Sequence, residues 1–198
     1  MADITHGTWI KDGKAVDVVY QSGIKVYGRN LLRDTANQSS DEWLEKNHSL
    51  ASDIGTYLGS KIFTTSALWT NAKYSFSSLA PLINLTDTYT YSVYVKINGV
   101  DPSTLSDSYA IAWYSMATDK YQNPIMLNTL SGNGWQRVSQ SFKFKTNVLD
   151  SAHIYQQSLR FELSNKLPDG VSISFAAMKL EKGGIVTPYS QAPEDILN

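Results

Sequence analysis

Cysteine is absent from this sequence of 198 residues. Its absence excludes a disulfide framework, a thiolate metal site and a cysteine nucleophile. Charge is sparse as well: only 18% of the residues are charged, whereas soluble domains usually carry about 25%. The formal net charge is −1, and lysine and arginine do not cluster into a basic face. A nucleic-acid partner is therefore not expected, since phosphate neutralisation needs clustered cations.

Long apolar runs are also missing. No stretch approaches the roughly 18 apolar residues of a membrane span, and residues 1–13 lack the apolar centre of a secretory signal. We therefore expect no membrane segment and no signal peptide. If the protein leaves the cell that makes it, we expect it to do so by another route, such as lysis.

Motifs of catalysis are missing too. The sequence contains no Gly-x-Ser-x-Gly, no phosphate-cradling glycine-rich loop and no His-Glu-x-x-His. His6, His48 and His153 are far apart and lack the spacing of metal ligands. A glycosidase needs two carboxylates at a set separation, and nothing singles out such a pair among residues like Asp107 and Asp119. We therefore expect that the protein is not an enzyme.

Aromatic and hydroxyl residues are abundant instead, including 12 Tyr and 5 Trp. Residues 88–98, TYTYSVYVKIN, alternate over their whole length, which is the period of a half-buried antiparallel strand. The outward row carries an aromatic ring, a cation and an amide, which suits a surface that contacts a ligand. The predicted inward row is Tyr89, Tyr91, Val93, Val95 and Ile97, and the predicted outward row is Thr90, Ser92, Tyr94, Lys96 and Asn98.

Shorter alternating segments recur at regular spacing along the chain. Residues 39–44 have the spacing of a capping box, which fits either a single helical turn or a structured loop. Residues 48–59 and 117–133 are expected to be loops. The predicted strands are 61–64, 73–79, 88–98, 109–115, 135–144, 158–164 and 171–180. Roughly eight strands with so little helix predict an all-β fold, an antiparallel β-sandwich of two packed sheets.

Residues 1–27 look like a separate small unit. Asp12-Gly13 and Ser22-Gly23 each lie between short β-type segments, and such pairs favour two-residue hairpin turns. We predict a three-stranded β-meander, which buries too little apolar surface to be stable alone and should pack on the main domain, another copy or an assembly partner. The alternative is a simple extension of the main sheet. Residues 28–192 then form the main domain, and residues 193–198 form a C-terminal tail or linker.

Four side chains on two predicted strands suit the recognition of a saccharide. Tyr94 and Lys96 face outward from the central strand, and Arg160 and Glu162 face outward from a later one. An aromatic ring stacks on the apolar C–H face of a pyranose, while charged groups hydrogen-bond to neighbouring hydroxyls. The four would act together if their strands lie near each other in one sheet. The alternative is that they are ordinary solvated strand residues.

Other aromatic residues are assigned by their positions. Trp69, in a predicted turn, is either a binding platform or a plug over the edge of the core. In the strand 109–115 we assign the bulkier row, which contains Trp113, to the core, so Tyr114 is expected to be exposed beside a groove. Trp135 is expected in the core, and Tyr57 and Tyr121 are further candidates in loops.

Four segments resemble the carbohydrate-binding-module jelly rolls found in tail and baseplate proteins of bacteriophages that infect Gram-positive bacteria. The most specific is the ending, in which Lys-Leu-Glu at 179–181 is followed by Thr-Pro-Tyr-Ser-Gln-Ala-Pro-Glu-Asp at 187–195. The others are GRNLL at 28–32, YSVYVK at 91–96 and GWQRVS at 134–139.

This resemblance implies a jelly-roll fold, binding of cell-wall or capsular polysaccharide, and no catalysis. It also implies a place in the virion, in a phage or prophage tail made in the host cytoplasm, with other tail proteins as partners and homo-oligomerisation as an option. No cofactor is expected apart from a structural calcium, which related jelly rolls often hold and for which Glu181 or Asp34 would supply oxygen ligands. We therefore expect a non-catalytic adhesion module. The alternative is a purely structural tail or baseplate assembly protein without sugar binding.

Overall fold

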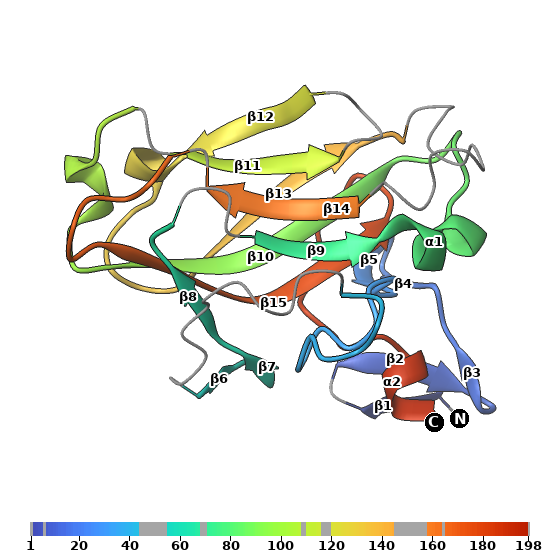
Figure 1. Ribbon diagram of the computed structural model, residues 1–198. Helices are drawn as coiled ribbons and strands as arrows, with labels where there is room; N and C mark the ends of the chain where they lie inside the picture. The colour runs from blue at the N-terminus through green and yellow to red at the C-terminus, as the bar shows by residue number, and fades with distance from the viewer. Residues whose placement is uncertain are drawn as a thin grey trace.

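Two four-stranded antiparallel sheets form the body of the computed structural model (Figure 1). The β10 sheet has the strand order β13-β10-β15-β8, and the β11 sheet has the order β12-β11-β14-β9. The strands are β8 (Phe63–Thr65), β9 (Asn71–Ser75), β10 (Tyr89–Asn98), β11 (Ala110–Ser115), β12 (Lys120–Met126), β13 (Gln136–Phe142), β14 (Ser158–Leu163) and β15 (Ser172–Lys182). The structure describes residues 2–5, 7–43, 55–67, 71–107, 110–115, 120–144, 158–163 and 165–197.

The eight strands pair as in one long antiparallel hairpin, in which strands at equal distances from the two ends of the series are partners. β8 pairs with β15 and β9 with β14, so the first strand partners the last and the second partners the seventh. In the same way β10 pairs with β13, and β11 pairs with β12. This nested antiparallel pairing, divided between two sheets, is the topology of a jelly roll. The predicted all-β antiparallel fold is confirmed.

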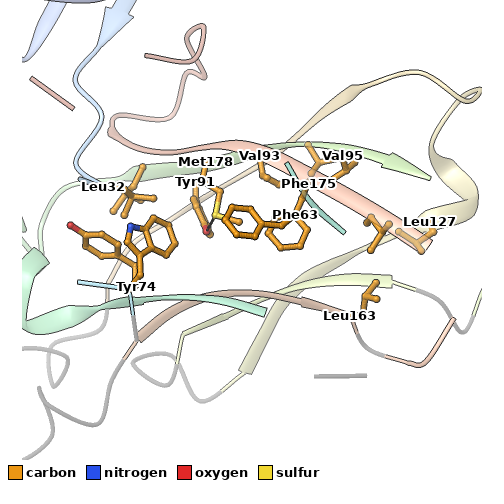
Figure 2. Close-up of a cluster of buried hydrophobic side chains, with 14 of the residues drawn as sticks. Leu32, Phe63, Tyr74, Tyr91, Val93, Val95, Leu127, Leu163, Phe175 and Met178 are labelled. Atoms are coloured by element: carbon orange, nitrogen blue, oxygen red, sulfur yellow. Dashed lines mark hydrogen bonds between the residues drawn. The ribbon is translucent and has the colours of Figure 1, made fainter. Parts of the chain in front are cut away.

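One continuous core lies between the two sheets (Figure 2). Tyr91 of β10 and Phe175 of β15 enter it from the β10 sheet, and both are 0% exposed. Tyr74 of β9 and Leu163 of β14 enter it from the β11 sheet. The predicted inward row of the central strand is confirmed, since Tyr89, Tyr91, Val93, Val95 and Ile97 are all at most 2% exposed.

The N-terminal segment contains the two predicted turns but not one continuous meander. At residues 12–13 and 22–23 all four φ angles lie between 50° and 77°, as a type I′ hairpin turn requires. A three-stranded antiparallel meander is present within residues 2–15, but the expected inclusion of residues 18–27 in it is wrong because the chain changes its pairing partner near residue 17. There the Arg29 N–H donates to the Asp17 carbonyl at 2.8 Å and extends a separate hairpin. The two units are the sheet of β1 (Ala2–Thr5), β2 (Thr8–Lys11) and β3 (Lys14–Ala15), and the hairpin of β4 (Val18–Gln21) and β5 (Ile24–Gly28).

Three local predictions are wrong in the main domain. Residues 120–126, predicted as loop, form β12, an edge strand in which Pro124 is tolerated because one side needs no partner. The end of the strand predicted over 73–79 is instead the one-turn helix α1 (Phe76–Leu79), which runs into a 3₁₀ turn containing Pro81. Within the loop predicted over 48–59, Tyr57 lies on a short strand. That strand is β6 (Thr56–Tyr57), which pairs with β7 (Ser60–Lys61).

The β4–β5 hairpin covers one end of the outer face of the β10 sheet. Lys25 forms an ion pair with Glu181 of β15 at 2.8 Å, and the two side chains are 4% and 0% exposed. Gly28 lies so close to the Glu181 carboxylate that a Cβ atom at this position would overlap it. Both chain ends lie together beside α2 (Glu194–Leu197) (Figure 1). The division after residue 27 stays a prediction. Within the described ranges, no helix has the length and apolarity needed to span a membrane.

Candidate functional site

The outer face of the β10 sheet has a covered end and an open end. At the covered end, Lys179 and Glu181 of β15 are 0% exposed because they bond to Lys25 and to the chain segment 187–188. The open end carries half-exposed side chains of β10. The predicted outward row is therefore divided: Thr90 and Ser92 are buried, whereas Tyr94, Lys96 and Asn98 reach the surface.

A β-bulge in β15 lies at the boundary between the covered end and the open end of this outer face. The register against β10 shifts next to Tyr94, and Ala177 has a φ of 54°. The Ala177 N–H leaves the ladder and donates to Ser60 Oγ at 3.0 Å. The bulge adds one residue to the strand, so Ala176 lies opposite Tyr94. The small side chain of Ala176 leaves room for aromatic rings above this part of the sheet.

Three aromatic side chains gather over this position, and we call Tyr57, Tyr94 and Trp135 the aromatic platform. The rings of Tyr57 and Trp135 are stacked, with centroids 4.4 Å apart and an interplanar angle of 15°. The Tyr57 and Tyr94 centroids are 5.3 Å apart, and the Arg137 guanidinium lies over the Tyr94 ring at 5.4 Å. All three rings are half-exposed. Their partly open faces can accept the apolar face of a ligand ring.

Local backbone geometry positions the members of the platform. Tyr57 precedes a two-residue turn at 58–59, where φ is 52° and 77°, again the type I′ pattern. Trp135 enters β13 directly before Gln136, which pairs with Val95. Burial, and next the neighbouring Tyr94, raise the pKa of the Tyr57 phenol, so its hydroxyl stays a hydrogen-bond donor at neutral pH. A hollow of about 430 Å³ borders the platform and is lined by Gly7, Leu58, Gly59, Tyr94, Pro188, Tyr189 and Gln191.

A row of interlocked polar groups continues from the platform toward the end of the sheet. The Asn98 amide donates to Ser172 Oγ at 3.2 Å and to Ser174 Oγ at 2.8 Å. Ser174 Oγ also lies 2.7 Å from Thr64 Oγ1, and Lys96 stands opposite Ser174 in the register. We call these five residues the polar strip. A second hollow, of about 510 Å³, adjoins the strip and is lined by Lys96, Ile97, Asn98, Gly99, Val100, Asp101 and Asn133.

The structure does not bring all of the predicted site residues together. Tyr94 and Lys96 lie on β10, whereas Tyr114 lies on β11 and Arg160 and Glu162 lie on β14. In the backbone register Tyr114 stands opposite Arg160, but the side chains of these β11 and β14 residues are outside the described part of the structure. Tyr94, Lys96, Arg160 and Glu162 would act together if their strands lay near each other in one sheet. This condition is not met, because the jelly-roll pairing places β10 in one sheet and β14 in the other.

Two members of the platform differ from the sequence-based expectation. Trp135 is predicted in the core, yet it packs half-exposed on the outer face. A signal for this exists, because Val138 faces the core and a residue three positions away must face the opposite side of the strand. Tyr57, expected as a further candidate in a loop, lies instead on β6, and the turn that follows it begins with leucine, which gives no signal for a hairpin. Trp69 lies outside the described residues, and its binding role, like those of the other five predicted site residues, stays a prediction.

The two carboxylates proposed for calcium are occupied by hydrogen-bond donors of the protein. Glu181 accepts from the Thr187 N–H and hydroxyl, each at 2.8 Å, and from Lys25. Asp34 Oδ2 accepts from two backbone N–H groups and one hydroxyl at Ser39 and Ser40. Calcium requires a set of oxygen ligands, and in the described ranges no three His, Asp or Glu side chains form a group that could hold a metal. Glu181 and Asp34 are therefore already engaged by donors within the protein, and calcium binding remains an untested prediction.

The fold and this face together define an all-β jelly-roll protein with an open aromatic and polar surface. No protein-family model and no curated protein sequence matches the chain. Among solved structures, the CBM22-1 xylan-binding domain of Paenibacillus barcinonensis Xyn10C aligns with a TM-score of 0.41 and 12% identity, over 81% of this chain and 99% of that chain.

Two further structures show likenesses of similar strength. The CBM22-1–GH10 modules of Clostridium thermocellum Xyn10B, complexed with xylohexaose, align with a TM-score of 0.38 and 11% identity, over 69% of this chain and 24% of that chain. A Stig cyclase from Fischerella sp. TAU aligns with a TM-score of 0.35 and 10% identity, over 80% of this chain and 99% of that chain. Likenesses this distant carry no argument about what the present chain binds.

Proposed function

We propose that this chain is a non-catalytic saccharide-binding module whose site is the open end of the outer face of the β10 sheet. The observation that carries the proposal is the stacked, half-exposed pair of Tyr57 and Trp135 beside the polar strip. A pyranose needs a flat aromatic surface for its C–H face and hydrogen-bonding groups for its hydroxyls. The platform and the strip offer these two kinds of surface side by side.

Contacts within the protein hold both halves of the site in place. Arg137 donates to Ser92 Oγ at 2.8 Å and lies over Tyr94, while Asn98 is held between two serine hydroxyls. A surface that is already in its binding geometry loses little conformational freedom when a sugar binds. Shallow sites of this type bind weakly as single copies, and several copies on one particle supply avidity.

We extend the proposal to the biological setting that the sequence resemblance implies. The ligand would be a cell-wall or capsular polysaccharide of a Gram-positive host, and the module would belong to a phage or prophage tail in the virion. The support is the likeness of residues 28–32 and 178–195 to the same segments of phage tail proteins. In this setting the partners are other tail proteins, and the chemical role is adhesion without bond cleavage.

Binding measurements on platform variants test the site. A glycan array and a pull-down with Gram-positive cell walls identify the polysaccharide, and calorimetry with its oligosaccharide fragments measures the affinity. We expect Trp135→Ala and Tyr94→Ala each to weaken binding at least tenfold, or about 1.4 kcal/mol, because each removes a ring face. The control is Tyr20→Ala, which removes an exposed aromatic ring at the covered end and should leave the affinity for the oligosaccharide fragments unchanged. A folded protein that binds no saccharide, or platform variants with unchanged affinity, would contradict the proposal.

A structural assembly protein is the second candidate function. The observation in its favour is the exposed apolar surface of the β4–β5 hairpin, where Tyr20 is 62% and Ile24 is 67% exposed. A stable assembly through residues 1–27, together with no saccharide binding by the folded chain, would favour this candidate over the first.

A further inference from the structure

The β4–β5 hairpin and the chain segment beside it gather exposed apolar side chains. Val18 is 41% exposed, Tyr20 62%, Ile24 67%, Ile185 58% and Val186 38%. Most of the large apolar side chains that stay exposed in the described part of the chain therefore lie in this one region, which we call the hairpin patch. Scattered apolar residues need no explanation, but a gathered patch marks an interaction surface.

The outer strand of the hairpin has a free edge. β4 and β5 form a sheet of two strands, and no other strand in the described residues pairs with β4. Free edges in monomeric proteins are usually protected by lysine, proline, inward-pointing charges or bulges that twist the edge away. β4 reads Val-Val-Tyr-Gln and contains neither charge nor proline, and the extra residue of the register irregularity, Val26, belongs to its partner β5. Its edge is therefore open to pairing with another strand.

The patch is held rigidly on the main domain. Lys25 Nζ donates to Glu181 Oε2 at 2.8 Å, to the Lys182 carbonyl at 2.7 Å and to the Ile185 carbonyl at 3.3 Å. One buried ammonium group thus ties the hairpin both to β15 and to the segment that carries Ile185 and Val186. The patch needs little further ordering to bind a partner, so a small interface can be sufficient.

The same surface carries both a projection and a hollow. Tyr20 and Ile24 project into solvent, and a hollow of about 250 Å³ beside them is lined by Asp17, Val18, Tyr20, Lys25, Lys182, Gly183, Gly184 and Ile185. Asp17 and Lys182 at the rim of the hollow already form ion pairs within the chain, with Arg29 at 3.0 Å and with Asp87 at 2.6 Å. A two-fold interface must be complementary to itself, and apolar projections beside an apolar hollow on one patch meet that requirement.

We propose that a second copy of this chain occupies the hairpin patch. The two β4 strands pair edge to edge and antiparallel about a two-fold axis, and each Tyr20 packs against the hollow of the other copy. The hairpin lies at the covered end of the outer face, so the platform and the polar strip of both copies stay open. The homodimer then presents two copies of the face. The interface is at the small end of specific interfaces, so we expect dimerisation that depends on protein concentration.

Sedimentation velocity of the full chain over a wide concentration range tests the proposal. We expect the mass to rise from that of the 22.0 kDa chain to twice that value as the concentration increases. Tyr20→Asp and Ile24→Asp should each keep the protein monomeric at every concentration, because each places a charge on the apolar hairpin patch that the second copy covers. Leu197→Asp, which changes an exposed leucine on α2 outside the patch, should dimerise like the natural chain.

The absence of cysteine allows a second, covalent test. Gln21→Cys places the only thiol of the molecule on β4, and a bis-maleimide reagent with a short flexible spacer should link two chains through it. Leu197→Cys, treated in the same way, should stay largely unlinked. A natural chain that is monomeric at all concentrations, with no linked dimer from Gln21→Cys, overturns the proposal even if the hairpin captures a different protein. A dimer that survives both Tyr20→Asp and Ile24→Asp also overturns it, because the contact then lies elsewhere.

Discussion

A single buried lysine determines much of the electrostatics at the covered end of the sheet. The Lys179 side chain is 0% exposed, donates to Thr187 Oγ1 at 2.9 Å and to the Pro188 carbonyl at 2.7 Å, and lies over the Tyr27 ring. Burial lowers the pKa of Lys179 from 10.5 to about 7, and the nearby Glu181 carboxylate offsets part of that shift. Folding therefore favours the neutral amine at a pH where the unfolded chain carries an ammonium group.

This lysine predicts a specific pH dependence of stability. Between about pH 7 and pH 10 the unfolded chain binds more protons at Lys179 than the folded chain, so the free energy of unfolding should rise with pH by up to about 1.4 kcal/mol per unit. Lys179→Met should remove this rise, because methionine fills the site without titrating. Denaturant unfolding at several pH values measures the slopes, with Lys96→Met on the open end as control. Equal slopes in the natural chain and Lys179→Met would contradict the assignment.

At some positions the residue pattern predicts the local structure, and at others it gives no signal. The alternation of β10 predicts its inward row because every second residue is apolar. The bulge at Ala177 has no such signal, since alanine is uncommon at a φ of 54°. Its position depends on Ser60, which accepts from its N–H and donates to the Thr35 carbonyl at 2.9 Å. Because that partner is distant in sequence, the bulge and the space it opens for the platform follow only from the folded structure.

At the scale of elements, the β4–β5 hairpin is held by a buried ion pair. Lys25→Met leaves the Glu181 carboxylate buried without its cation, and removal of one partner of such a pair usually costs about 3–5 kcal/mol. The double variant Lys25→Met/Glu181→Leu should recover a large part of that loss, because the carboxylate no longer lies buried without the Lys25 cation. Unfolding free energies of the two single variants and the double variant measure the coupling. Additive effects would show that the pair does not hold the hairpin.

Elements were predictable where local chemistry determines them. Asp-Gly and Ser-Gly identify the turns at 12–13 and 22–23, because both pairs tolerate positive φ. The turn at 58–59 and the edge strand β12 have no such signal: leucine opens the turn, and proline interrupts the strand. The pairing of strands that are distant in the chain was less predictable than the turns and the strands themselves. The partner of β10 on one side is β15, which follows some 80 residues later along the chain, and no periodicity within either strand indicates this.

Segments from distant parts of the chain form the candidate site, so only part of the site could be predicted from the sequence. Tyr94 and Lys96 follow from the alternation of one strand. The neighbours of Tyr94 in the platform lie on the distant β6–β7 hairpin and at the start of β13. Only the pairing of the folded strands brings these two segments next to Tyr94. The same topology sends Tyr114 and Arg160 to the opposite sheet. Residue types suited to sugar binding can thus be recognised in the sequence, but their grouping depends on long-range pairing.

Contacts across the whole molecule predict that the N-terminal segment and the jelly roll unfold together. Thr8 Oγ1 donates to the Gln191 carbonyl at 2.6 Å. Lys25 Nζ donates to Glu181 Oε2 at 2.8 Å and to the Lys182 carbonyl at 2.7 Å. Loss of the segment would expose the buried charges of β15 to water without their partners.

Hydrogen exchange and thermal unfolding of the full chain provide the measurement. Backbone amides of the β4–β5 hairpin should be protected to the same degree as those of β10 and β15, and calorimetry should show one transition rather than two. A chain that begins at Gly28 should melt several degrees lower, because Glu181 then lacks its buried cation. Fast exchange confined to residues 1–27, with an unchanged melting temperature for the shortened chain, would instead establish these residues as a separate attachment unit.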